Sequence, residues 1–291
     1  MSKKPLLIYN PIAGHGKARK KLPFIEKKFA QYQFSLELVL TQYPGHAEEI
    51  ARQEAENKRG VILAAGGDGT MNEVINGIMT AGIPAEERPV MGVLPVGRGN
   101  DFAFGLNITN NLEQAISIIV GNRTQKVDIG SVVGGDYPQG RFFGNGIGLG
   151  FDTMVGFEAA KIKWAKGMSS YLIGLFRTIK LYHQAPIYQV ELDDESFTGP
   201  CLQISIMNGR RMGGAFLMTP DSDPCDGTFN LCIGNGIEQK RILALALKFL
   251  NGSHVHDPAI QMTQSRKVTV KAVTGGIPAH ADGETICECG T

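Results

Sequence analysis

Glycines and one carboxylate stand together at residues 66–70, between an apolar run and the start of a helical pattern. The apolar run at 61–65 ends at Gly66-Gly67, and Asp68 follows shortly before helical periodicity begins at Met71. Glycines let a backbone approach a ligand closely, and the first N–H groups of a helix attract an anion. A carboxylate among such groups suits a metal ion or a ligand hydroxyl. The stretch therefore predicts a nucleotide phosphate site, with a helix cap as the alternative role of Asp68.

Two common phosphate-binding motifs are excluded because the residues that they require are absent. A Walker loop requires Ser or Thr after Gly-Lys, but Gly16-Lys17 is followed by Ala18. The glycine-rich run at 144–150 also fails the dinucleotide pattern, because a residue other than glycine falls at the last required position. We interpret that run as a tight connection between strands.

Composition sets the broad class. The chain has 291 residues, 43% of them hydrophobic and 20% charged, which fits one large or two medium domains. A net charge of +1 gives no general attraction to nucleic acid. No apolar run approaches the length of about 18 residues that a transmembrane segment needs, and the N-terminal run is too short for a secretion signal. The five scattered cysteines are expected to be reduced thiols of a cytoplasmic protein.

Strand-like and helical patterns alternate in the first third of the chain. We expect strands at 6–9, 34–40, 61–65 and 90–94, and helices at 17–32, 47–56 and 71–80, the first with a kink at Pro23. Such alternation predicts parallel strands with helical crossovers in a doubly wound sheet. Ligands of these sheets lie outside the carboxyl ends of the strands, where the loops Asn10–Gly14, Gly66–Thr70 and Pro95–Asp101 fall.

Strand patterns dominate after about Arg123. They cover residues 141–147, 187–193, 201–207, 228–233, 260–263 and 267–273, with helical patterns at 158–182 and 237–250. We therefore predict a doubly wound, Rossmann-like α/β domain at residues 1–125. A mainly antiparallel β-sandwich domain is predicted at residues 126–291.

Six short segments, in this order, point to one family. They are Asn10-Pro11-x-Ala-Gly, Gly-Gly-Asp68-Gly-Thr-Met-Asn-Glu, Gly97-Arg-Gly-Asn-Asp-Phe, Lys126-Val-Asp-Ile-Gly, Asp226-Gly-Thr-Phe and Asp282-Gly-Glu. The set resembles the diacylglycerol kinase catalytic-domain family of bacterial lipid kinases, which are related to sphingosine and ceramide kinases and more distantly to NAD kinase. The resemblance covers essentially the whole chain.

The resemblance implies phosphoryl transfer from ATP to a lipid hydroxyl with magnesium as the metal, and diacylglycerol is the acceptor it favours. Asp68 and Asp101 match the acids that organise the catalytic magnesium, directly or through water. The positions that match the nucleotide-binding loops of the family are Asn10, Pro11, Ile12, Ala13, Gly14, Thr41, Gly66, Gly67, Asp68, Gly69, Thr70, Met71, Asn72, Gly97 and Arg98.

The resemblance implies two further roles for acidic residues in the second half of the chain. Asp282 matches the general base of the family in what also reads as an Asp-Gly hairpin turn, with Glu284 as its partner in binding metal-linked water. Asp223, Asp226 and Thr228 match a second, structural magnesium site, Asp223 and Thr228 through their carbonyl groups. An oxygen-only set suits magnesium, and a solvated acidic loop at 221–226 is the alternative.

The chain departs from the family at two places. Arg98 stands where the family usually has a threonine that touches the nucleotide, so Arg98 either pairs with phosphate or points away. Family members also continue for a further strand or two beyond the Asp-Gly-Glu segment. Either the tail is short by nature or the sequence is truncated, and the seating of Asp282 depends on which holds.

A lipid kinase must meet its substrate at a membrane surface. The segment Glu158–Tyr182 carries five basic residues against one acid, together with Trp164 and Tyr171, which is typical of an interfacial helix. A helix packed on the β domain with a solvated basic face is the alternative. We expect a cytoplasmic protein peripheral to the inner face of the membrane, and a homodimer because related bacterial enzymes form one.

Two other functions compete with this interpretation. NAD kinases share Gly-Gly-Asp-Gly-Thr, although Asn10-Pro11 and the segment 99–102 favour the lipid side. A catalytically silent nucleotide- or lipid-binding regulator is the other alternative, and the presence of all four catalytic acids argues against it. Other glycerolipids, sphingoids and polyprenols share the hydroxyl and the apolar body of diacylglycerol, so the residues do not select among these acceptors.

Overall fold

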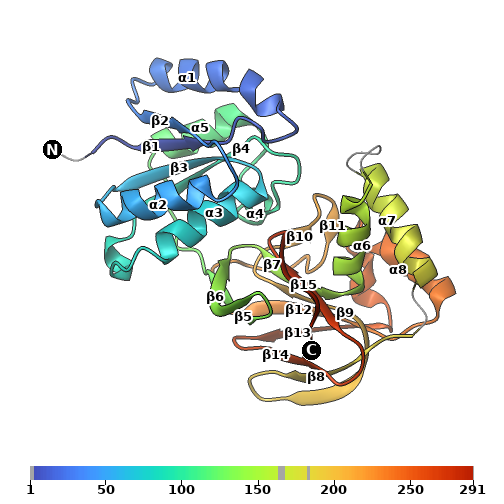
Figure 1. Cartoon of the computed structure of the whole chain (residues 1–291). Helices are drawn as coiled ribbons and strands as arrows, with labels where there is room; N and C mark the ends of the chain where they lie inside the picture. Colours follow the sequence, from blue (N-terminus) through green and yellow to red (C-terminus); the bar gives the residue numbers. More distant parts are fainter. Residues whose placement is uncertain (1–2, 163–167, 182–183, 291) are drawn as a thin grey trace. The chain divides into compact units, whose positions relative to one another are not determined.

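The computed structural model describes residues 3–162, 168–181 and 184–290, which form two compact units (Figure 1). Unit 1 contains the chain up to Ser131 together with Arg141–Gly144. Unit 2 contains Val132–Gly140 and the chain from Asn145 onward. The chain therefore passes from unit 1 to unit 2, returns briefly, and then stays in unit 2.

A four-stranded parallel sheet forms the centre of unit 1. Its strands are β1 (Leu6–Tyr9), β2 (Glu37–Leu40), β3 (Val61–Gly66) and β4 (Val90–Pro95), in the order β2-β1-β3-β4. The chain moves outward from β1 to β2 and then crosses to β3 on the other side of β1. The order of the strands thus reverses between β1 and β3, and ligands of open α/β sheets bind at such a switch point.

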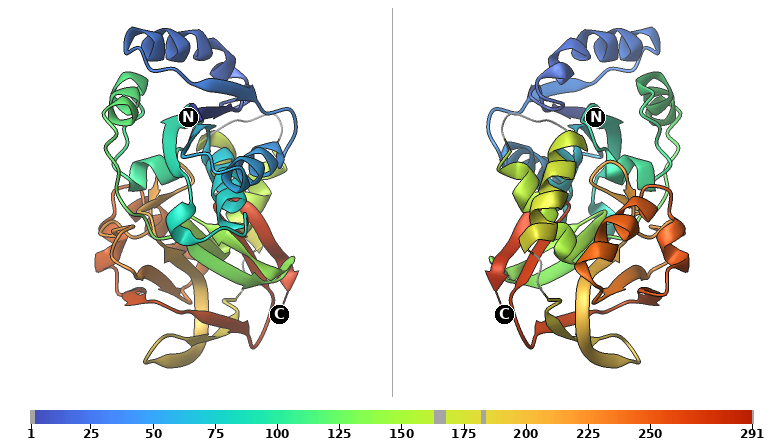
Figure 2. Two further views of the ribbon diagram at one scale, coloured as in Figure 1. Left: turned by 90° about the vertical axis from the view of Figure 1, so that its left-hand side faces the viewer. Right: turned by 90° about the vertical axis from the view of Figure 1, so that its right-hand side faces the viewer.

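Helices cover both faces of this sheet. One hydrophobic cluster joins α1 (Leu22–Gln31) and α5 (Leu112–Val120) to the first face. A second cluster joins α2 (His46–Glu56), α3 (Asp68–Met79) and α4 (Asp101–Gly105) to the opposite face. Figure 1 and the two turned views in Figure 2 show these layers within unit 1. The predicted doubly wound α/β fold is confirmed.

The predicted helix at 17–32 is wrong in one respect. The segment forms a short 3-10 helix, η1 (Lys17–Lys20), and α1 begins only at Leu22 with Pro23 in its first turn. A proline lacks the N–H group that a helix interior needs, but the first turn leaves that group unpaired in any case. Pro23 therefore starts a helix and does not kink one. In α3, the helix begins at Asp68, three residues earlier than predicted.

Two asparagines of α3 hold the returning segment of unit 1. The side chain of Asn76 donates to the Phe142 carbonyl at 2.9 Å and accepts from the Phe142 N–H at 2.9 Å. Asn72 accepts from Arg141 at 2.6 Å and donates to the same carbonyl at 3.1 Å. Both side chains are almost fully buried. One helix face thus holds the backbone of Phe142 and the side chain of Arg141.

Replacing Asn76 with alanine is expected to lower the free energy of unfolding by about 1–3 kcal/mol, because the partly buried N–H of Phe142 loses its acceptor and the Phe142 carbonyl loses one of its two donors. Urea unfolding followed by circular dichroism measures this change. Gln53→Ala, on the exposed side of α2, is the control and should leave the stability nearly unchanged. Equal stabilities of the two variants would contradict the anchoring role of Asn76.

Antiparallel pairing dominates unit 2, as predicted. The main sheet has eight strands, with the order β13-β12-β9-β7-β15-β16 and with β8 and β14 attached through β9. Among the described residues, β10 and β11 form a separate two-stranded sheet in unit 2, and β5 and β6 form another that has residues in both units. The strands are β5 (Gly130–Gly134), β6 (Tyr137–Phe143), β7 (Gly146–Gly150), β8 (Ile187–Glu191), β9 (Ser196–Met207), β10 (Arg211–Met212), β11 (Phe216–Leu217), β12 (Phe229–Asn235), β13 (Ile260–Ser265), β14 (Thr269–Ala272), β15 (Ile277–Ala281) and β16 (Glu284–Gly290).

The glycine-rich run at 144–150 is not a connection between strands. Residues Gly146–Gly150 form β7, which pairs with β9 on one side and β15 on the other. The single strand predicted at 141–147 is in fact two strands that are separated at residues 144–145. Glycine weakens a strand in isolation, so its use in a central strand usually marks a close approach by another group.

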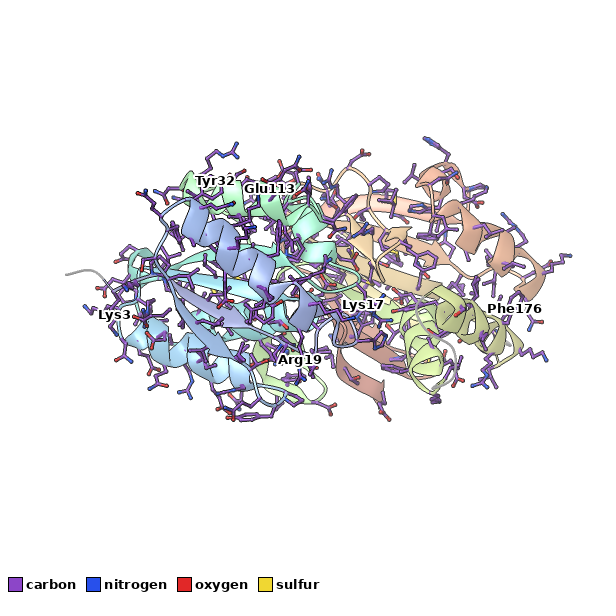
Figure 3. All side chains as sticks on the ribbon, turned by 90° about the horizontal axis from the view of Figure 1, so that it is seen from above. Lys3, Lys17, Arg19, Tyr32, Glu113 and Phe176 are labelled. Carbon is purple, nitrogen blue, oxygen red and sulfur yellow. The ribbon has the colours of Figure 1, made fainter. Side chains whose placement is uncertain are left out.

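Helices α6 (Phe151–Ala160), α7 (Met168–Leu181) and α8 (Gln239–Lys248) pack on one face of the main sheet. The single helix predicted at 158–182 is wrong, because Lys161 and Ile162 lie outside any helix. Trp164, Lys163, Lys166 and Tyr182 lie outside the described residues. Glu158 pairs with Lys161 and Arg177, whereas Phe176 is exposed on α7 (Figure 3). Among the described helices, none combines the length and the apolar character needed to cross a membrane.

Candidate nucleotide-binding and catalytic residues

Four loops of unit 1 meet at the carboxyl edge of the parallel sheet: the three predicted there and the loop that carries Thr41. Thr41 follows β2, Asn10 follows β1, Gly66-Gly67 ends β3 and Gly97 follows β4. Backbone hydrogen bonds continue the sheet into these loops, from Asn10 N–H to Ala65 and from Thr41 N–H to Tyr9, both at 2.9 Å. The N–H groups of Val96 and Gly97 both donate to the Gly66 carbonyl. Loops that are far apart in the sequence therefore form one continuous rim.

Glycines at this rim are required by close packing. A Cβ atom on Gly97 would overlap the backbone of Gly67, and a Cβ atom on Gly66 would overlap the Thr70 side chain. The Thr70 hydroxyl also accepts a hydrogen bond from the Asn10 side chain at 2.9 Å. Thr70 therefore joins the loop after β1 to the loop after β3 at the switch point of the sheet.

Asp68 lies in the first turn of α3, at the centre of the rim. The first N–H groups of a helix have no partner inside the helix, so a carboxylate there is favourable and an anion can bind beside it. The Asp68 Oδ1 atom accepts a hydrogen bond from the Phe102 N–H at 3.1 Å, which brings it to the start of α4. Asp101, the first residue of α4, is buried next to this contact. The two predicted magnesium-organising acids thus lie on adjacent loops.

The loop after β1 is held by its own side chain. Asn10 Oδ1 accepts from the Ile12 N–H at 3.1 Å, which makes a tight turn that leaves Ile12 exposed. Gly14 has a positive φ of 60°, and a Cβ atom there would lie 3.2 Å from the Val96 carbonyl oxygen. The exposed cations Lys17 and Arg19 extend from η1 directly after this loop (Figure 3).

Glu73 is a positioning residue of this region that sequence reasoning missed. Its carboxylate accepts hydrogen bonds from the N–H groups of Gly45 and Ala47 at 3.0 and 3.1 Å. These donors belong to the start of α2, so a residue of α3 fixes the loop that carries Thr41. A signal exists in the sequence, since Glu73 is the last residue of the Gly-Gly-Asp-Gly-Thr-Met-Asn-Glu segment, and a glutamate is a natural acceptor for the N-terminus of another helix.

Two predicted nucleotide-binding side chains face the interior. Met71 is buried in the core between α3 and the sheet, and Asn72 is engaged with Arg141 and Phe142. Only the main-chain groups of these two residues are therefore available to contact a nucleotide. Arg98, in contrast, is exposed in the bend after β4.

Asp282 occupies a hairpin turn between β15 and β16, as predicted. Its φ of 49° and the φ of 88° at Gly283 are the positive values that such a two-residue turn requires. The Asp282 Oδ1 atom accepts from the N–H groups of Asn145 and Gly146 at 3.0 and 2.9 Å. The carboxylate is therefore held in a fixed orientation at the start of β7. Glu284 is the first residue of β16 and belongs, like Asp282, to unit 2.

The residues of the expected second magnesium site lie in an exposed loop before β12. Asp226 Oδ1 accepts from both the N–H and the hydroxyl group of Thr228 at 2.9 Å. Asp223 Oδ1 accepts from the Cys225 N–H at 3.0 Å. These contacts are those of ordinary turns. The second magnesium site stays a prediction.

The donor chemistry at the rim fits magnesium. Magnesium prefers oxygen ligands and is usually held by one or two carboxylates together with substrate phosphates and water. Asp68 and Asp101 provide two carboxylates beside the N-terminus of α3. Within the described residues, no group of three or more His, Cys, Asp or Glu side chains gathers around one point.

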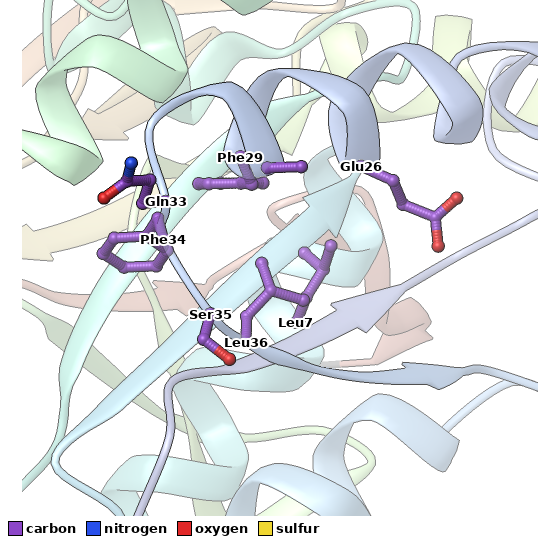
Figure 4. Close-up of a pocket in the computed structure, with 8 residues that line it drawn as sticks. Leu7, Glu26, Phe29, Gln33, Phe34, Ser35 and Leu36 are labelled. Atoms are coloured by element: carbon purple, nitrogen blue, oxygen red, sulfur yellow. The ribbon is translucent and has the colours of Figure 1, made fainter.

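A surface pocket of about 390 Å³ lies elsewhere in unit 1. Figure 4 shows Phe29 of α1 above Leu7 of β1, with Phe34 and Leu36 from the segment that precedes β2. This segment enters the sheet at its amino edge, opposite to the rim that carries Asn10 and Asp68. The pocket therefore takes no part in the candidate site.

Comparison with sequence families gives two matches that together span most of the chain. Residues 4–132 match the family described as "Diacylglycerol kinase catalytic domain". Residues 145–291 match the family described as "YegS C-terminal NAD kinase beta sandwich-like domain". The first match contains the four loops of the rim, and the second contains Asp282 and Glu284.

Individual relatives agree with these matches. The chain is 31% identical over 288 residues to a protein named diacylglycerol kinase from Staphylococcus saprophyticus, covering 98% of this chain and 90% of that protein. A diacylglycerol kinase from Bacillus subtilis is 30% identical and is likewise covered to 90%. A crystal structure of a diacylglycerol kinase from Bacillus anthracis has 20% identity and a TM-score of 0.70 over 97% of this chain and 90% of that one. The last likeness concerns the fold alone.

Proposed function

The chain belongs to the diacylglycerol kinase catalytic-domain family, and we propose on that basis that it transfers the γ-phosphate of ATP to a lipid hydroxyl. Diacylglycerol is the proposed acceptor and phosphatidic acid the product. One observation supports a kinase most directly. The loops after the parallel strands form a continuous rim, in which Asp68 lies between the N-terminus of α3 and the start of α4.

The rim residues bind and orient the nucleotide in this proposal. The N–H groups at the start of α3 receive phosphate oxygens, and the glycines at 66, 67 and 97 allow the close approach. Asp68 and Asp101 hold magnesium, which neutralises charge on the phosphates when it is bound. Phosphoryl transfer needs little more from a protein than such positioning and charge neutralisation.

Asp282 accepts the proton of the lipid hydroxyl in this proposal. The two N–H groups that hold its Oδ1 atom fix the direction of the carboxylate, which a general base requires. Glu284 assists by binding metal-linked water. The enzyme is proposed to work as a homodimer. It is proposed to act in the cytoplasm at the inner face of the membrane, because the lipid acceptor resides in the membrane.

Asp68→Asn is expected to raise the magnesium concentration needed for half-maximal activity by about 10–100-fold, as the loss of one metal-organising carboxylate typically does. The asparagine keeps an oxygen that can accept from the Phe102 N–H, so the loops should stay in place. Magnesium titrations of ATP binding and of turnover measure the effect. Glu86→Gln removes an exposed acid of the same unit and serves as the control. Identical magnesium curves for the two variants would contradict the role of Asp68.

The proposed function is tested by incubating the purified protein with labelled ATP, magnesium and a total bacterial lipid extract, followed by mass analysis of any new phospholipid. Phosphatidic acid is the expected product. A parallel reaction with NAD covers the NAD kinase alternative, and labelled NADP there would replace the proposal. ATP binding without phosphorylation of either substrate would instead identify a silent regulator.

A further inference from the structure

The loop after β2 carries an exposed aromatic ring. Tyr43 lies two residues after Thr41, in the segment that joins β2 to α2, and 48% of its surface is exposed. The other three loops of the rim, at residues 10–16, 67 and 96–100, contain no Phe, Tyr or Trp, and the structure describes all of these positions. The rim therefore offers a flat, exposed ring only at the end of β2.

Contacts with the first turn of α2 hold this ring in one orientation. The Tyr43 ring stacks on the imidazole of His46, with centroids 4.5 Å apart and an angle of 16° between the planes. The Tyr43 hydroxyl donates to Glu49 Oε2 at 2.7 Å. His46 is itself fixed, because its Nδ1 atom accepts from the Gln42 N–H at 3.1 Å. A ring that is ordered in advance loses less conformational entropy when a flat ligand binds to it.

The charges around the ring disfavour a phosphate group and leave a neutral ligand unopposed. The N–H groups of Gly45 and Ala47, at the start of α2, already donate to the Glu73 carboxylate. The N-terminus of α2 is therefore compensated by a negative charge and attracts a further anion less than a free helix N-terminus does. Glu49 adds a second, exposed carboxylate next to the Tyr43 hydroxyl. The ring thus suits a flat group without charge.

The position of the loop along the sheet matches the length of a nucleotide. The N-terminus of α3, which we propose to bind phosphate, follows β3, and Thr41 follows β2. Both strands pair with β1, so their ends are two strand spacings apart, or about 10 Å. The ribose and the base of a nucleotide extend over a comparable length beyond its phosphates. A nucleotide that lies along this edge with its phosphates at α3 therefore reaches the loop after β2 with its base.

We propose that the purine base of the nucleotide stacks on Tyr43, which His46 supports from behind. His46 occupies one face of the Tyr43 ring, and the base takes the opposite, exposed face. Every base has a flat π-face, and an aromatic side chain stabilises it by stacking. This proposal rests on the proposed ATP-dependent function and adds to it the residues that hold the base.

The test uses two variants of the same residue. Tyr43→Ala removes the ring, whereas Tyr43→Phe keeps the ring and removes only the hydroxyl group that donates to Glu49. Tyr32→Ala is the matched control, because Tyr32 has a similar exposure of 45% and lies at the C-terminal end of α1 in the same unit (Figure 3). Thermal unfolding of each variant checks the fold.

Isothermal titration in the presence of magnesium compares ATP with tripolyphosphate, which has the phosphates of ATP but no base. Tyr43→Ala is expected to weaken ATP binding about tenfold, an effect within the range of base stacking on an aromatic side chain. The affinity for tripolyphosphate should not change. Tyr43→Phe should bind ATP about as tightly as the wild type, because stacking needs the ring and not the hydroxyl group. Tyr32→Ala should bind both ligands normally.

Saturation-transfer NMR provides a second readout that a structural role of Tyr43 would not produce. Saturation of the aromatic protons of the protein should reach the base protons of ATP in the wild type and in Tyr43→Phe, and it should fall in Tyr43→Ala. A purely structural ring would instead weaken ATP and tripolyphosphate alike, or make Tyr43→Phe as weak as Tyr43→Ala. Either result, or an unchanged ATP affinity of Tyr43→Ala, would overturn the proposal.

These binding measurements contain no lipid, which separates this proposal from the proposed function. Wild-type protein that binds ATP but phosphorylates no lipid, with weaker ATP binding by Tyr43→Ala, would overturn the kinase function and leave the stacking site standing. Lipid phosphorylation by Tyr43→Ala with an unchanged KM for ATP would overturn the stacking site and leave the kinase function standing. No binding of ATP to the wild-type protein would also overturn the stacking site.

Discussion

Asp282→Asn is expected to lower kcat for lipid phosphorylation by about 10²–10⁴-fold, which is the usual contribution of a general base. ATP affinity should change little, because the nucleotide loops belong to the other unit. Asparagine suits the site well. It adopts the positive φ of this turn more readily than most residues, and its side-chain oxygen can still accept from Asn145 and Gly146. The loss would therefore reflect basicity and not folding.

Single-turnover phosphorylation and ATP binding, measured side by side, check this expectation. Asp193→Asn is the control, since Asp193 is an exposed acid in a turn of the same unit. Undiminished turnover by Asp282→Asn would remove the base from the proposed reaction. A loss of ATP binding in parallel with turnover would show that Asp282 serves the structure instead.

Gly97→Ala is expected to abolish measurable ATP binding and to destabilise unit 1 by about 1–3 kcal/mol, the usual range for overpacking. The added methyl group would meet the backbone of Gly67, which cannot move aside as a flexible side chain can. Relief requires the loop after β4 to separate from the loop after β3. The N-terminus of α3, which we propose to bind phosphate, would then lose its contact with the loop after β4.

Gly60→Ala is the matched control for this variant. Gly60 precedes β3 in the same unit, and nothing lies within 4 Å of a Cβ atom added there. Isothermal titration with ATP and urea unfolding separate the two expected effects. Normal ATP affinity in Gly97→Ala would contradict the assignment of this loop contact to the nucleotide site.

The meeting of the loops after β1, β3 and β4 at one edge of the sheet could be predicted from the sequence because of the physics of parallel sheets. Short apolar runs alternate with helical patterns, so the carboxyl ends of β1, β3 and β4 must lie at one edge, and the polar loops after them must meet there. Asp68 and Asn10 could be placed together without knowledge of any contact. The hairpin at Asp282 is equally local, since Asp-Gly favours the positive φ values of a two-residue turn.

Features that depend on long-range pairing could not be predicted. His280 and Ser205 flank Gly148 only because β15 and β9 pair with β7, and an antiparallel sheet permits many such orders. The glycine run resembles a connection in the sequence, because the reason for its glycines lies in side chains that other strands and α6 supply. The break in the segment 158–182 escapes prediction for a different reason, since the apolar period continues past residues where the backbone leaves the helix.

The pairing of β7 with β15 has a consequence for the way this protein is made. β7 is the first strand of the main sheet to leave the ribosome, and its partner β15 follows only after β8, β9 and β12–β14. The strands of the unit 1 sheet are synthesised before those of the main sheet of unit 2, so unit 1 can fold while translation continues. The carboxylate of Asp282 is seated only after the β15–β16 hairpin closes on residues 145–146. A chain that stops before β15 and β16 would therefore carry the rim of unit 1 without the proposed base.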